Sequence, residues 1–446
     1  MQIFRKIYRR WNIPYIWECL VLVQLAILLI LFLQWPVTLN FLVLESEYPY
    51  WWPLIQQFHA ENPRIRIQLS PQKTTDDIQA IYKTDFKNFR SFYDLVYMDI
   101  IWLPKFAASD WLRDLSEQIS PQELENFVKR EVNLGRYQKQ EQKLDQEPDQ
   151  KLDQKRLYRI PFRSDVGVLL YRKDLIDIDQ VPKTFADLRN FYNNSQDLNK
   201  QVPWVYFWQG KSYEGLVATF FEVLSAFNGD WINEENNEVK LDKEAAIEAI
   251  KFLRRMIDVG VSPPQVSTYT EENSLEDFQQ GKAVFLRTWP NFWAKANADD
   301  SPIKGKVGMA QIVGNKDNSA GCLGGWGFGI AKNGQHPNEA WQAIKFFTSE
   351  EAQRRFVLDS SYLPTRIALF TDREITEKYP YFEEIGMLEQ VEKAVLRPRL
   401  ENYDEVSKIL QEYLSRALFT DLSPEEAIEK AVTILPIIKD PVNKAK

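Results

Sequence analysis

The sequence predicts an α/β fold, and the order of elements in its first hundred residues carries that prediction. Residues 37–44 (VTLNFLVL) and 93–102 (YDLVYMDIIW) are apolar runs typical of buried strands, and residues 64–69 (RIRIQL) alternate as a half-buried strand does. Helical segments follow the first strand, at 51–61, and precede the third. The order β-α-β-α-β predicts a layer of strands covered by helices, with ligands bound at the carboxyl ends of the strands.

The remainder of the chain mixes helices with isolated strands. We expect a strand pair within 156–176, interrupted at 161–165, and then mainly helices up to residue 300. Residues 283–289 and 306–312 are expected to be strands, and the last hundred residues are expected to be helical. Three helix starts carry capping residues: Ser120, Thr184 and Ser423.

One segment departs from this pattern, a polar insert at 138–156 (QKQEQKLDQEPDQKLDQKR). The pentapeptide QKLDQ occurs twice in it, and apolar residues are almost absent. Such a composition cannot bury enough surface to fold by itself, so we expect a solvated loop or a frayed helix. Binding of a partner by the insert is an alternative.

The most informative stretch is 321–356, where a glycine-rich aromatic strand leads into an amphipathic helix. Glycines at 321, 324, 325, 327 and 329 leave the backbone bare around Trp326. Glycine within a strand often marks the close approach of a ligand or of another backbone. An indole beside bare peptide groups suits a flat, hydroxylated ligand such as a sugar. A sheet strand with glycines that serve packing is the alternative.

Composition excludes several functional classes. At 446 residues the chain is long enough for two or three domains. Its 55 Lys and Arg against 63 Asp and Glu, with the basic residues dispersed beyond the N-terminus, argue against a nucleic-acid surface. Two histidines and two cysteines, Cys19 and Cys322, make a His/Cys metal site improbable. We find no nucleophile elbow, P-loop or dinucleotide fingerprint.

The N-terminal sequence predicts that the chain is targeted to a membrane. Basic residues at positions 5, 6, 9 and 10 precede an apolar run at 19–33 that flanking aromatic residues extend toward bilayer thickness. No small-residue cleavage site follows, and Cys19 comes too early for a lipoprotein site. We therefore expect residues 1–36 to form an uncleaved signal anchor, with the rest of the chain on the outer face of the cytoplasmic membrane. A cleaved signal and a free periplasmic protein is the alternative.

Several carboxylates stand beside aromatic residues at the ends of predicted elements: Asp99, Asp165 and Glu214. A pair of them could hydrolyse a glycoside. They could equally accept hydrogen bonds from sugar hydroxyl groups, or simply cap helices at the surface.

Seven ordered segments resemble the extracellular solute-binding proteins of sugar ABC transporters, nearest to the trehalose/maltose-binding branch. They include YDLVYMDIIWLPKFAASDWLRDL, IPFRSDVGVLLYRKDLI and GGWGFGIAKNGQHPNEAWQAIKFFTSEEAQ, and their positions are 93–115, 160–176, 205–230, 278–293, 324–353, 362–366 and 396–410. Together the matches cover essentially residues 37–435. The anchor and the polar insert lie outside the resemblance.

The resemblance implies a two-lobed periplasmic-binding-protein fold with a hinge of several crossing strands, which closes on a sugar. It divides the chain into lobe 1, at 37–157 and 308–362, and lobe 2, at 158–307 and 363–446. Carried over residue by residue, it implies these ligand-binding positions: Glu47, Asp99, Trp102, Asp165, Trp289, Gly324, Gly325, Trp326, Arg397 and Arg399.

The function that follows is a substrate-binding component of an ABC importer, which is not an enzyme, needs no cofactor and binds permease subunits. The ligand implied is a di- or oligosaccharide or a glycosylated polyol. Relatives often have an aromatic residue where this chain has Asn291, and an arginine where it has residues 74–77, so the sugar stays open. The alternatives are a membrane-anchored glycosidase and a sugar-binding module that reports to a sensor kinase.

Overall fold

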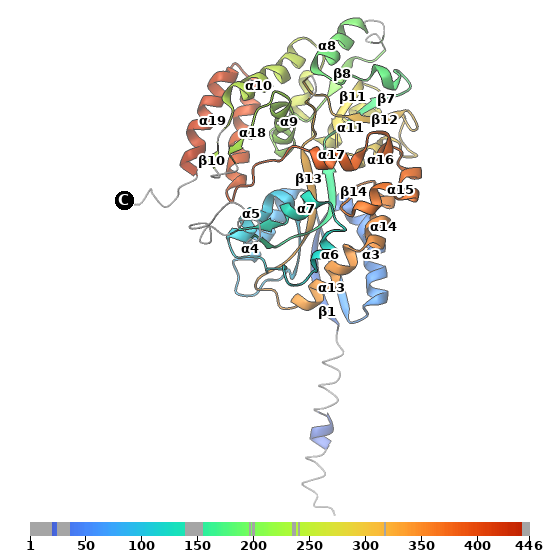
Figure 1. The fold of residues 1–446 in the computed structure, drawn as a ribbon, viewed down its shortest axis with the longest axis vertical. Helices are drawn as coiled ribbons and strands as arrows, with labels where there is room; N and C mark the ends of the chain where they lie inside the picture. Colours follow the sequence, from blue (N-terminus) through green and yellow to red (C-terminus); the bar gives the residue numbers. More distant parts are fainter. Residues whose placement is uncertain are drawn as a thin grey trace, which may run out of the picture.

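The protein is described by a computed structural model, which covers residues 20–24, 36–138, 155–195, 198, 201–233, 238–239, 241–315 and 318–438. It has two α/β lobes, one above the other in Figure 1. The predicted α/β class and two-lobed architecture are confirmed. Each lobe has its own apolar core, and two long strands run between the lobes.

The first lobe is built from the start of the chain and a later return. It contains β1 (Val37–Leu44), α3 (Tyr48–Glu61), β2 (Ile65–Gln72), α4 (Thr75–Asp85), β3 (Leu95–Asp99), α5 (Leu103–Ala108), α6 (Pro121–Leu124), α7 (Lys129–Leu134), α13 (Pro337–Phe347) and α14 (Glu350–Ser360). β1 and β2 pair in parallel, as the alternation of strands and helices predicts. β3 ends earlier than expected, because the Asp99 carboxylate caps a short 3-10 helix, Ile100–Trp102.

The second lobe holds the middle and the end of the chain. It contains β7 (Val168–Arg172), α8 (Phe185–Asn194), β8 (Trp204–Phe207), α9 (Glu214–Ala226), α10 (Lys243–Asp258), α11 (Glu271–Gln279), β11 (Ala283–Thr288), α12 (Asn291–Ala296), β12 (Val307–Gln311), α15 (Arg373–Lys378), α16 (Tyr381–Glu384), α17 (Met387–Lys393), α18 (Tyr403–Phe419) and α19 (Pro424–Ile438). Its sheet has the order β12-β7-β11-β8. Small strand pairs, β4 (Arg136–Tyr137) with β5 (Arg156–Leu157) and β9 (Ile232–Asn233) with β10 (Glu238–Val239), lie outside the main sheets.

The pairing of β12 corrects one predicted boundary. We expected lobe 1 to resume at residue 308, yet β12 pairs antiparallel with β7 along its whole length, from Val307↔Arg172 to Gln311↔Val168. The strand therefore belongs to the second sheet, and the chain returns to the first lobe only through the next strand. Two short strands that look alike in sequence cannot be assigned to one sheet or the other by their patterns alone.

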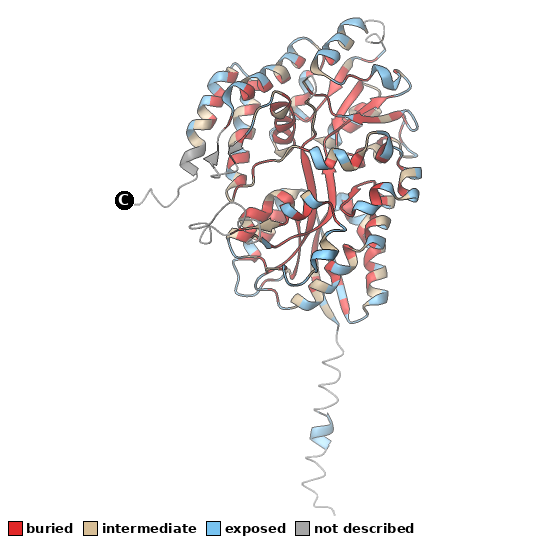
Figure 2. Cartoon of the chain, viewed as in Figure 1, coloured by how far each residue is buried: buried red, intermediate tan, exposed pale blue. Residues whose placement is uncertain are grey.

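Two strands carry the chain between the lobes. β6 (Ile160–Val166) and β13 (Leu323–Ile330) pair antiparallel in the four-stranded order β14-β6-β13-β3, where β14 is Leu363–Pro364. Figure 2 shows both buried along their length. The interruption expected at 161–165 is absent, because a bulge at Phe162 accommodates Pro161 and the break falls at Gly167 instead.

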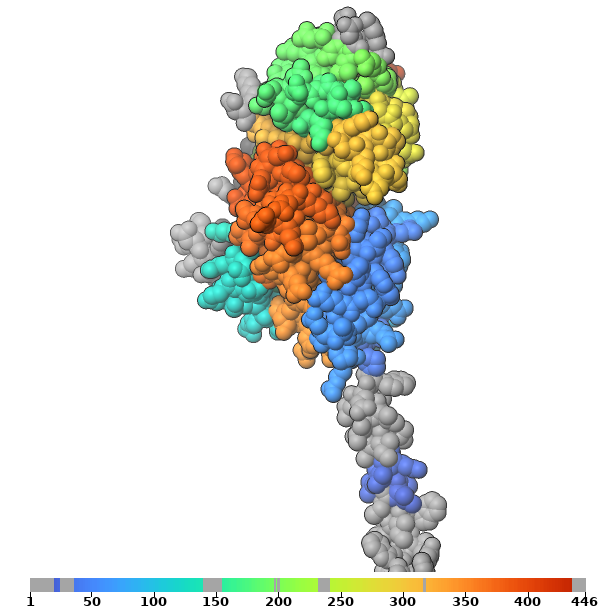
Figure 3. Space-filling model, turned by 90° about the vertical axis from the view of Figure 1, so that its right-hand side faces the viewer, coloured from blue at the N-terminus to red at the C-terminus, as the bar shows by residue number. Residues whose placement is uncertain are grey.

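The lobes abut on one side of the molecule. In Figure 3 the blue N-terminal part of the first lobe meets the gold part of the second. Contacts across the junction include the Ser361 hydroxyl, which donates to the Asn291 carbonyl at 3.1 Å. On another side Gln79 of α4 donates to the Asp404 carboxylate of α18 at 3.0 Å.

Two predicted segments fall largely outside the described residues. The expected anchor, 1–36, includes only residues 20–24 and 36 of them, and the polar insert only its ends at 138 and 155–156. None of the helices that the structure describes has the length and apolar content of a membrane span.

Candidate ligand-binding site

The pairing of β6 with β13 sets several predicted site residues side by side at the junction of the lobes. Asp165 lies opposite Gly324 in the ladder, and Trp326 lies opposite both Arg163 of β6 and Asp99 of β3. Because side chains alternate along a strand, Arg163 and Asp165 share one face of β6. Their side chains form an ion pair there.

Arg163 is the centre of a buried polar network. Its Nη2 donates to Glu47 Oε1 at 2.7 Å, its Nε donates to the Tyr97 hydroxyl at 3.0 Å, and its Nη1 donates to Asp165 Oδ2. The ring of Tyr362 packs against the guanidinium, 4.1 Å from its centre. One buried cation thus orients two carboxylates from different parts of the chain.

Asp165 has hydrogen-bonding capacity that the protein leaves unused. Its Oδ1 is buried and has no hydrogen-bond partner among the described residues, although Oδ2 is held by Arg163. The pKa of Asp165 is raised to about 7, chiefly by burial, against the lowering effect of Arg163 and with further raising by Glu47 and Asp99. A buried acceptor without a partner costs free energy, so this oxygen is the natural place for a ligand donor.

Trp289 and the Asp165 side chain both lie close to Gly324. A Cβ atom at Gly324 would lie 3.2 Å from the Cβ of Asp165 and 3.7 Å from the indole ring of Trp289. The indole is half-buried, its Nε1 donates to Glu271 at 3.0 Å, and Arg287 lies 4.4 Å from its ring centre. The Trp289 ring, just after β11, and the Asp165 side chain of β6 therefore meet at Gly324 of β13.

Trp326, the indole for which we expected a sugar-binding role, is buried. Only 3% of its surface is exposed, and its ring packs on Tyr97 at 4.8 Å and Trp102 at 5.0 Å. The glycines around it serve packing between strands: a Cβ at Gly325, where φ is +138°, would lie 2.8 Å from the Arg163 carbonyl, and one at Gly327 would lie 2.4 Å from the carbonyl of residue 160. The alternative that we left open thus describes most of this strand.

Two further predicted residues, Arg397 and Arg399, donate hydrogen bonds to other groups of the protein. Arg397 donates to Glu214 at 2.9 Å and to the Leu323 carbonyl at 3.3 Å, and its guanidinium lies 3.7 Å from Asp99. Burial raises the pKa of Glu214, and Arg397 opposes that rise. Arg399 donates instead to the main-chain carbonyls of residues 134 and 136, so it ties the C-terminal segment to the first lobe.

No metal site competes with this arrangement in the part of the chain that the structure describes, where no group of three His, Cys, Asp or Glu side chains could hold an ion. Residues 43–354 match the bacterial extracellular solute-binding protein family. The chain belongs to this family.

Similar proteins are known from several organisms. A solute-binding protein of T. maritima, the maltose-bound MalE3, is 30% identical, with a TM-score of 0.79 over 90% of this chain and 99% of its own. A probable ABC transporter-binding protein of Deinococcus radiodurans is 27% identical over 80% of this chain and 82% of its own length. The maltotriose-binding protein of Pyrococcus abyssi is 23% identical over 67% of this chain and 59% of its own.

Two residues that organise the candidate site of this solute-binding protein were not predicted from the sequence. Arg163 was not singled out, although an arginine inside a strand that is otherwise buried signals a paired carboxylate. Glu271, which holds the Trp289 indole, begins α11 and looked like an ordinary acidic residue of a first helical turn. The contact of Glu271 with the Trp289 indole depends on the fold, so the sequence pattern could not indicate it.

Proposed function

We propose that this solute-binding protein binds a di- or oligosaccharide between its lobes and presents it to the permease subunits of an ABC importer. The observation that carries the proposal is the buried Asp165 Oδ1, without a partner among the described residues, on a side chain that lies with the Trp289 ring against Gly324. A sugar offers hydroxyl donors for the carboxylate and an apolar face for the indole. The maltose-bound relative from T. maritima supports a maltose- or trehalose-like ligand, with a glycosylated polyol as a variant.

Within this proposal the predicted residues divide by their contacts. Asp165, Trp289 and Gly324 touch the ligand, and Gly325 gives the hinge strands their close approach. Glu47, Asp99 and Arg397 hold their neighbours in place through ion pairs, as Arg399 does through carbonyl groups. Trp102 and Trp326, the latter in the hinge strand β13, pack against each other in the core of the first lobe.

Ligand binding would be coupled to closure of the lobes. The contacts named so far come from the hinge strands and from the second lobe, and we propose that the first lobe reaches the ligand only on closure. A ligand that then touches both lobes favours the closed arrangement. Small-angle scattering of the ligand-free and sugar-saturated protein checks this. We expect the radius of gyration to fall on addition of the sugar, and an unchanged value would contradict a hinged trap.

We also propose that the protein returns its sugar unchanged. The family is one of binding proteins, and Asp99 and Glu214 share one arginine, Arg397, rather than facing a substrate as a free acid and base. Chromatography of maltose after long incubation with the protein should recover the disaccharide quantitatively. Glucose that appears in proportion to protein concentration would indicate a glycosidase instead.

For location we propose the outer face of the cytoplasmic membrane, with residues 1–36 as an uncleaved anchor. The support is the apolar run at 19–33, its basic flank and the lack of a small-residue cleavage site. N-terminal sequencing of the native protein should begin within the first residues. A mature N-terminus near residues 34–46 would instead indicate a cleaved signal and a free periplasmic protein.

A ligand panel tests the central proposal. The full chain, purified in detergent micelles, is heated with maltose, trehalose, longer glucans and sugar alcohols, and the melting temperature is recorded. A ligand at one hundred times its Kd should stabilise the protein by about 2.7 kcal/mol. We expect a shift with at least one glucoside and none with amino acids. A panel in which only non-sugars shift the melting temperature would overturn the sugar assignment.

A further inference from the structure

The end of the first lobe farthest from the ligand site carries an exposed aromatic and basic loop, residues 86–93 (FKNFRSFY), between α4 and β3. Phe89 is 91% exposed and Phe92 is 60% exposed, the two largest exposed fractions among the large apolar side chains that the structure describes beyond residue 36. Lys87 and Arg90 are exposed beside them and form no ion pair within the described part of the chain. Exposed aromatic side chains in a loop usually mark a surface that binds something.

The topology places this loop at the end where the chain enters the domain. β1 and β2 are parallel, so α3 and α4 both run back toward the start of β1, where their following loops must lie. Hydrogen bonds agree with this: the Val37 N–H donates to the Arg64 carbonyl at 2.9 Å, and Asn40 Nδ2 donates to the Phe92 carbonyl at 3.1 Å. In Figure 1, β1 begins at the tip of the first lobe opposite the second lobe.

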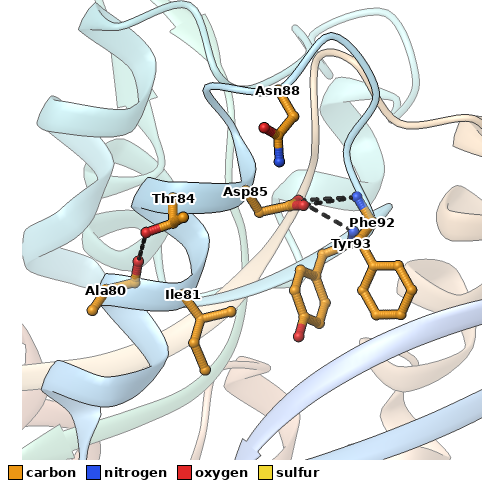
Figure 4. Close-up of a pocket in the computed structure, with 7 residues that line it drawn as sticks. All are labelled: Ala80, Ile81, Thr84, Asp85, Asn88, Phe92 and Tyr93. Carbon is orange, nitrogen blue, oxygen red and sulfur yellow. Dashed lines mark hydrogen bonds between the residues drawn. The ribbon is translucent and has the colours of Figure 1, made fainter.

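The loop is held rigidly although its tip is exposed. The Asp85 carboxylate accepts from the N–H of Phe92 at 3.0 Å, and the Ser91 N–H donates to the Asn333 carbonyl at 3.2 Å. Asn333 Nδ2 donates in return to the Asn88 carbonyl at 3.2 Å. Figure 4 shows Phe92 and Tyr93 beside a hollow of about 420 Å³ that α4 lines from the other side. Hydrogen bonds on both sides of Phe89, at residues 88, 91 and 92, therefore hold the segment that exposes it.

We propose that this tip of the first lobe rests on the lipid bilayer, with Phe89 and Phe92 in the headgroup region and Arg64, Lys87 and Arg90 on anionic headgroups. This inference rests on the proposed anchor. Four peptide steps separate the end of the apolar run at Leu33 from Val37 in β1, which is at most about 14 Å even when fully extended. Aromatic rings and basic side chains are the residues that favour a membrane interface.

The consequence is a defined orientation of the binding protein. The loops at this tip follow helices α3 and α4. The candidate site lies at the carboxyl end of β3 and on the crossing strands, which is the opposite end of the first lobe. A lobe that stands on its tip would hold the junction of the lobes away from the lipid, and the second lobe would then stay free to move. The chain as a whole carries a formal charge of −8, so attraction to anionic lipid has to come from local basic side chains such as Lys87 and Arg90.

The test uses the full chain reconstituted in permease-free vesicles of phosphatidylcholine with phosphatidylglycerol. In a Cys19→Ser background, an environment-sensitive fluorophore is attached at Phe89→Cys or, as a control, at Ile178→Cys, a site that is 53% exposed on the second lobe. Cys322 is buried and stays unlabelled. Flotation measures anchoring, and quenching by lipids with spin-labelled headgroups or chains measures contact with the bilayer.

We expect the label at 89 to be quenched at least twofold more than the label at 178, and Lys87→Glu with Arg90→Glu to reduce that quenching in the anionic vesicles. Equal, weak quenching at both sites in vesicles that carry the protein would overturn the inference and leave the anchor intact. A chain that does not float with the vesicles would overturn the anchor and this inference with it. A shift of the melting temperature by sugar tests the binding function separately in every variant.

Discussion

Two buried arginines, one in each four-stranded sheet, differ in what their ion-pair partners leave unsatisfied. Arg287 of β11 donates to both oxygens of Glu222, at 2.9 and 2.6 Å, and to Gln209 at 3.0 Å. Within the described residues, no buried nitrogen or oxygen of the Arg287–Glu222 pair lacks a partner. Arg163 of β6 is held as firmly, yet its partner Asp165 keeps one buried oxygen free.

We interpret this difference as that between a structural ion pair and the proposed binding site. A buried pair with every bond made has nothing to offer a ligand, so its role is to fix the second lobe. A buried pair with an open acceptor carries a cost that a ligand can remove. We therefore expect variants around Arg287 to act on stability, and variants around Asp165 to act on sugar binding.

The largest effect should come from Glu222→Leu. The substitution leaves Arg287 as a buried charge without its carboxylate, which costs about 3–5 kcal/mol of unfolding free energy. Urea denaturation measures the loss, and Glu222→Gln, which keeps hydrogen-bonding groups, should lose less. Sugar affinity of the folded fraction should stay near that of the wild type. A stable Glu222→Leu protein with impaired binding would reverse the assignment of the two arginines.

The two indoles near the junction give a second contrast. Trp326→Ala should cost about 3–5 kcal/mol of stability, because it empties a packed position. Trp289→Ala should change stability less but weaken sugar binding by about 1.5–2 kcal/mol, or more than tenfold in Kd, if about 60–80 Å² of sugar face covers the ring. Melting curves of both variants measure the loss of stability, and calorimetric titrations measure the change in Kd. Normal binding by Trp289→Ala would remove this ring from the site.

Asp165→Asn should weaken sugar binding by about tenfold, because a hydrogen bond to a charged group contributes about 1.5–3 kcal/mol and the amide keeps part of it. Stability should change little, since Arg163 keeps its bond to Glu47. Asp174→Asn, which alters a partly exposed carboxylate paired with Arg172, is the matched control and should bind normally. Equal affinities of the two variants would contradict a contact at Asp165.

The last prediction concerns pH dependence. The pKa of Asp165 in the folded chain, about 7, lies above its ordinary value of 3.8, so the free protein should lose stability as pH rises from about 4 to 7. Sugar hydroxyl groups donate to the ionised form, so affinity should rise over the same range and level off above about pH 8. At pH 6 about a tenth of Asp165 is ionised, which predicts binding roughly tenfold weaker than at the plateau. Asp165→Asn should bind with no such slope.

Much of the fold could be predicted from local patterns. The strands 37–44, 283–289 and 306–312 were confirmed as β1, β11 and β12, and the capping residues at Ser120 and Thr184 do cap helices. β8 was missed, because four residues between helices give too short a pattern. The assignment of β12 to its sheet depends on a long-range partner, which no local pattern contains.

The candidate site was harder to predict, since its chemistry depends on what each group contacts. Asp165 could be chosen from its place beside aromatic residues at the end of a predicted element, but its free oxygen follows from the geometry of Arg163 and Glu47. The burial of Trp326 could not be predicted, because glycines that make room for β6 look the same in sequence as glycines that make room for a ligand. Alternation indicates which face a residue shares, and only packing determines whether that face is open.

The proton balance of sugar binding tests the central claim most directly. Calorimetric titration of the preferred sugar at pH 7, repeated in buffers of different ionisation enthalpy, gives the number of protons released per ligand. Since about half of Asp165 is protonated at pH 7 in the free protein, binding to the ionised form should release about half a proton. The release should vanish in Asp165→Asn and persist in Glu222→Gln. No release from the wild type, or proton uptake, would contradict the account of Asp165 as the acceptor for the ligand.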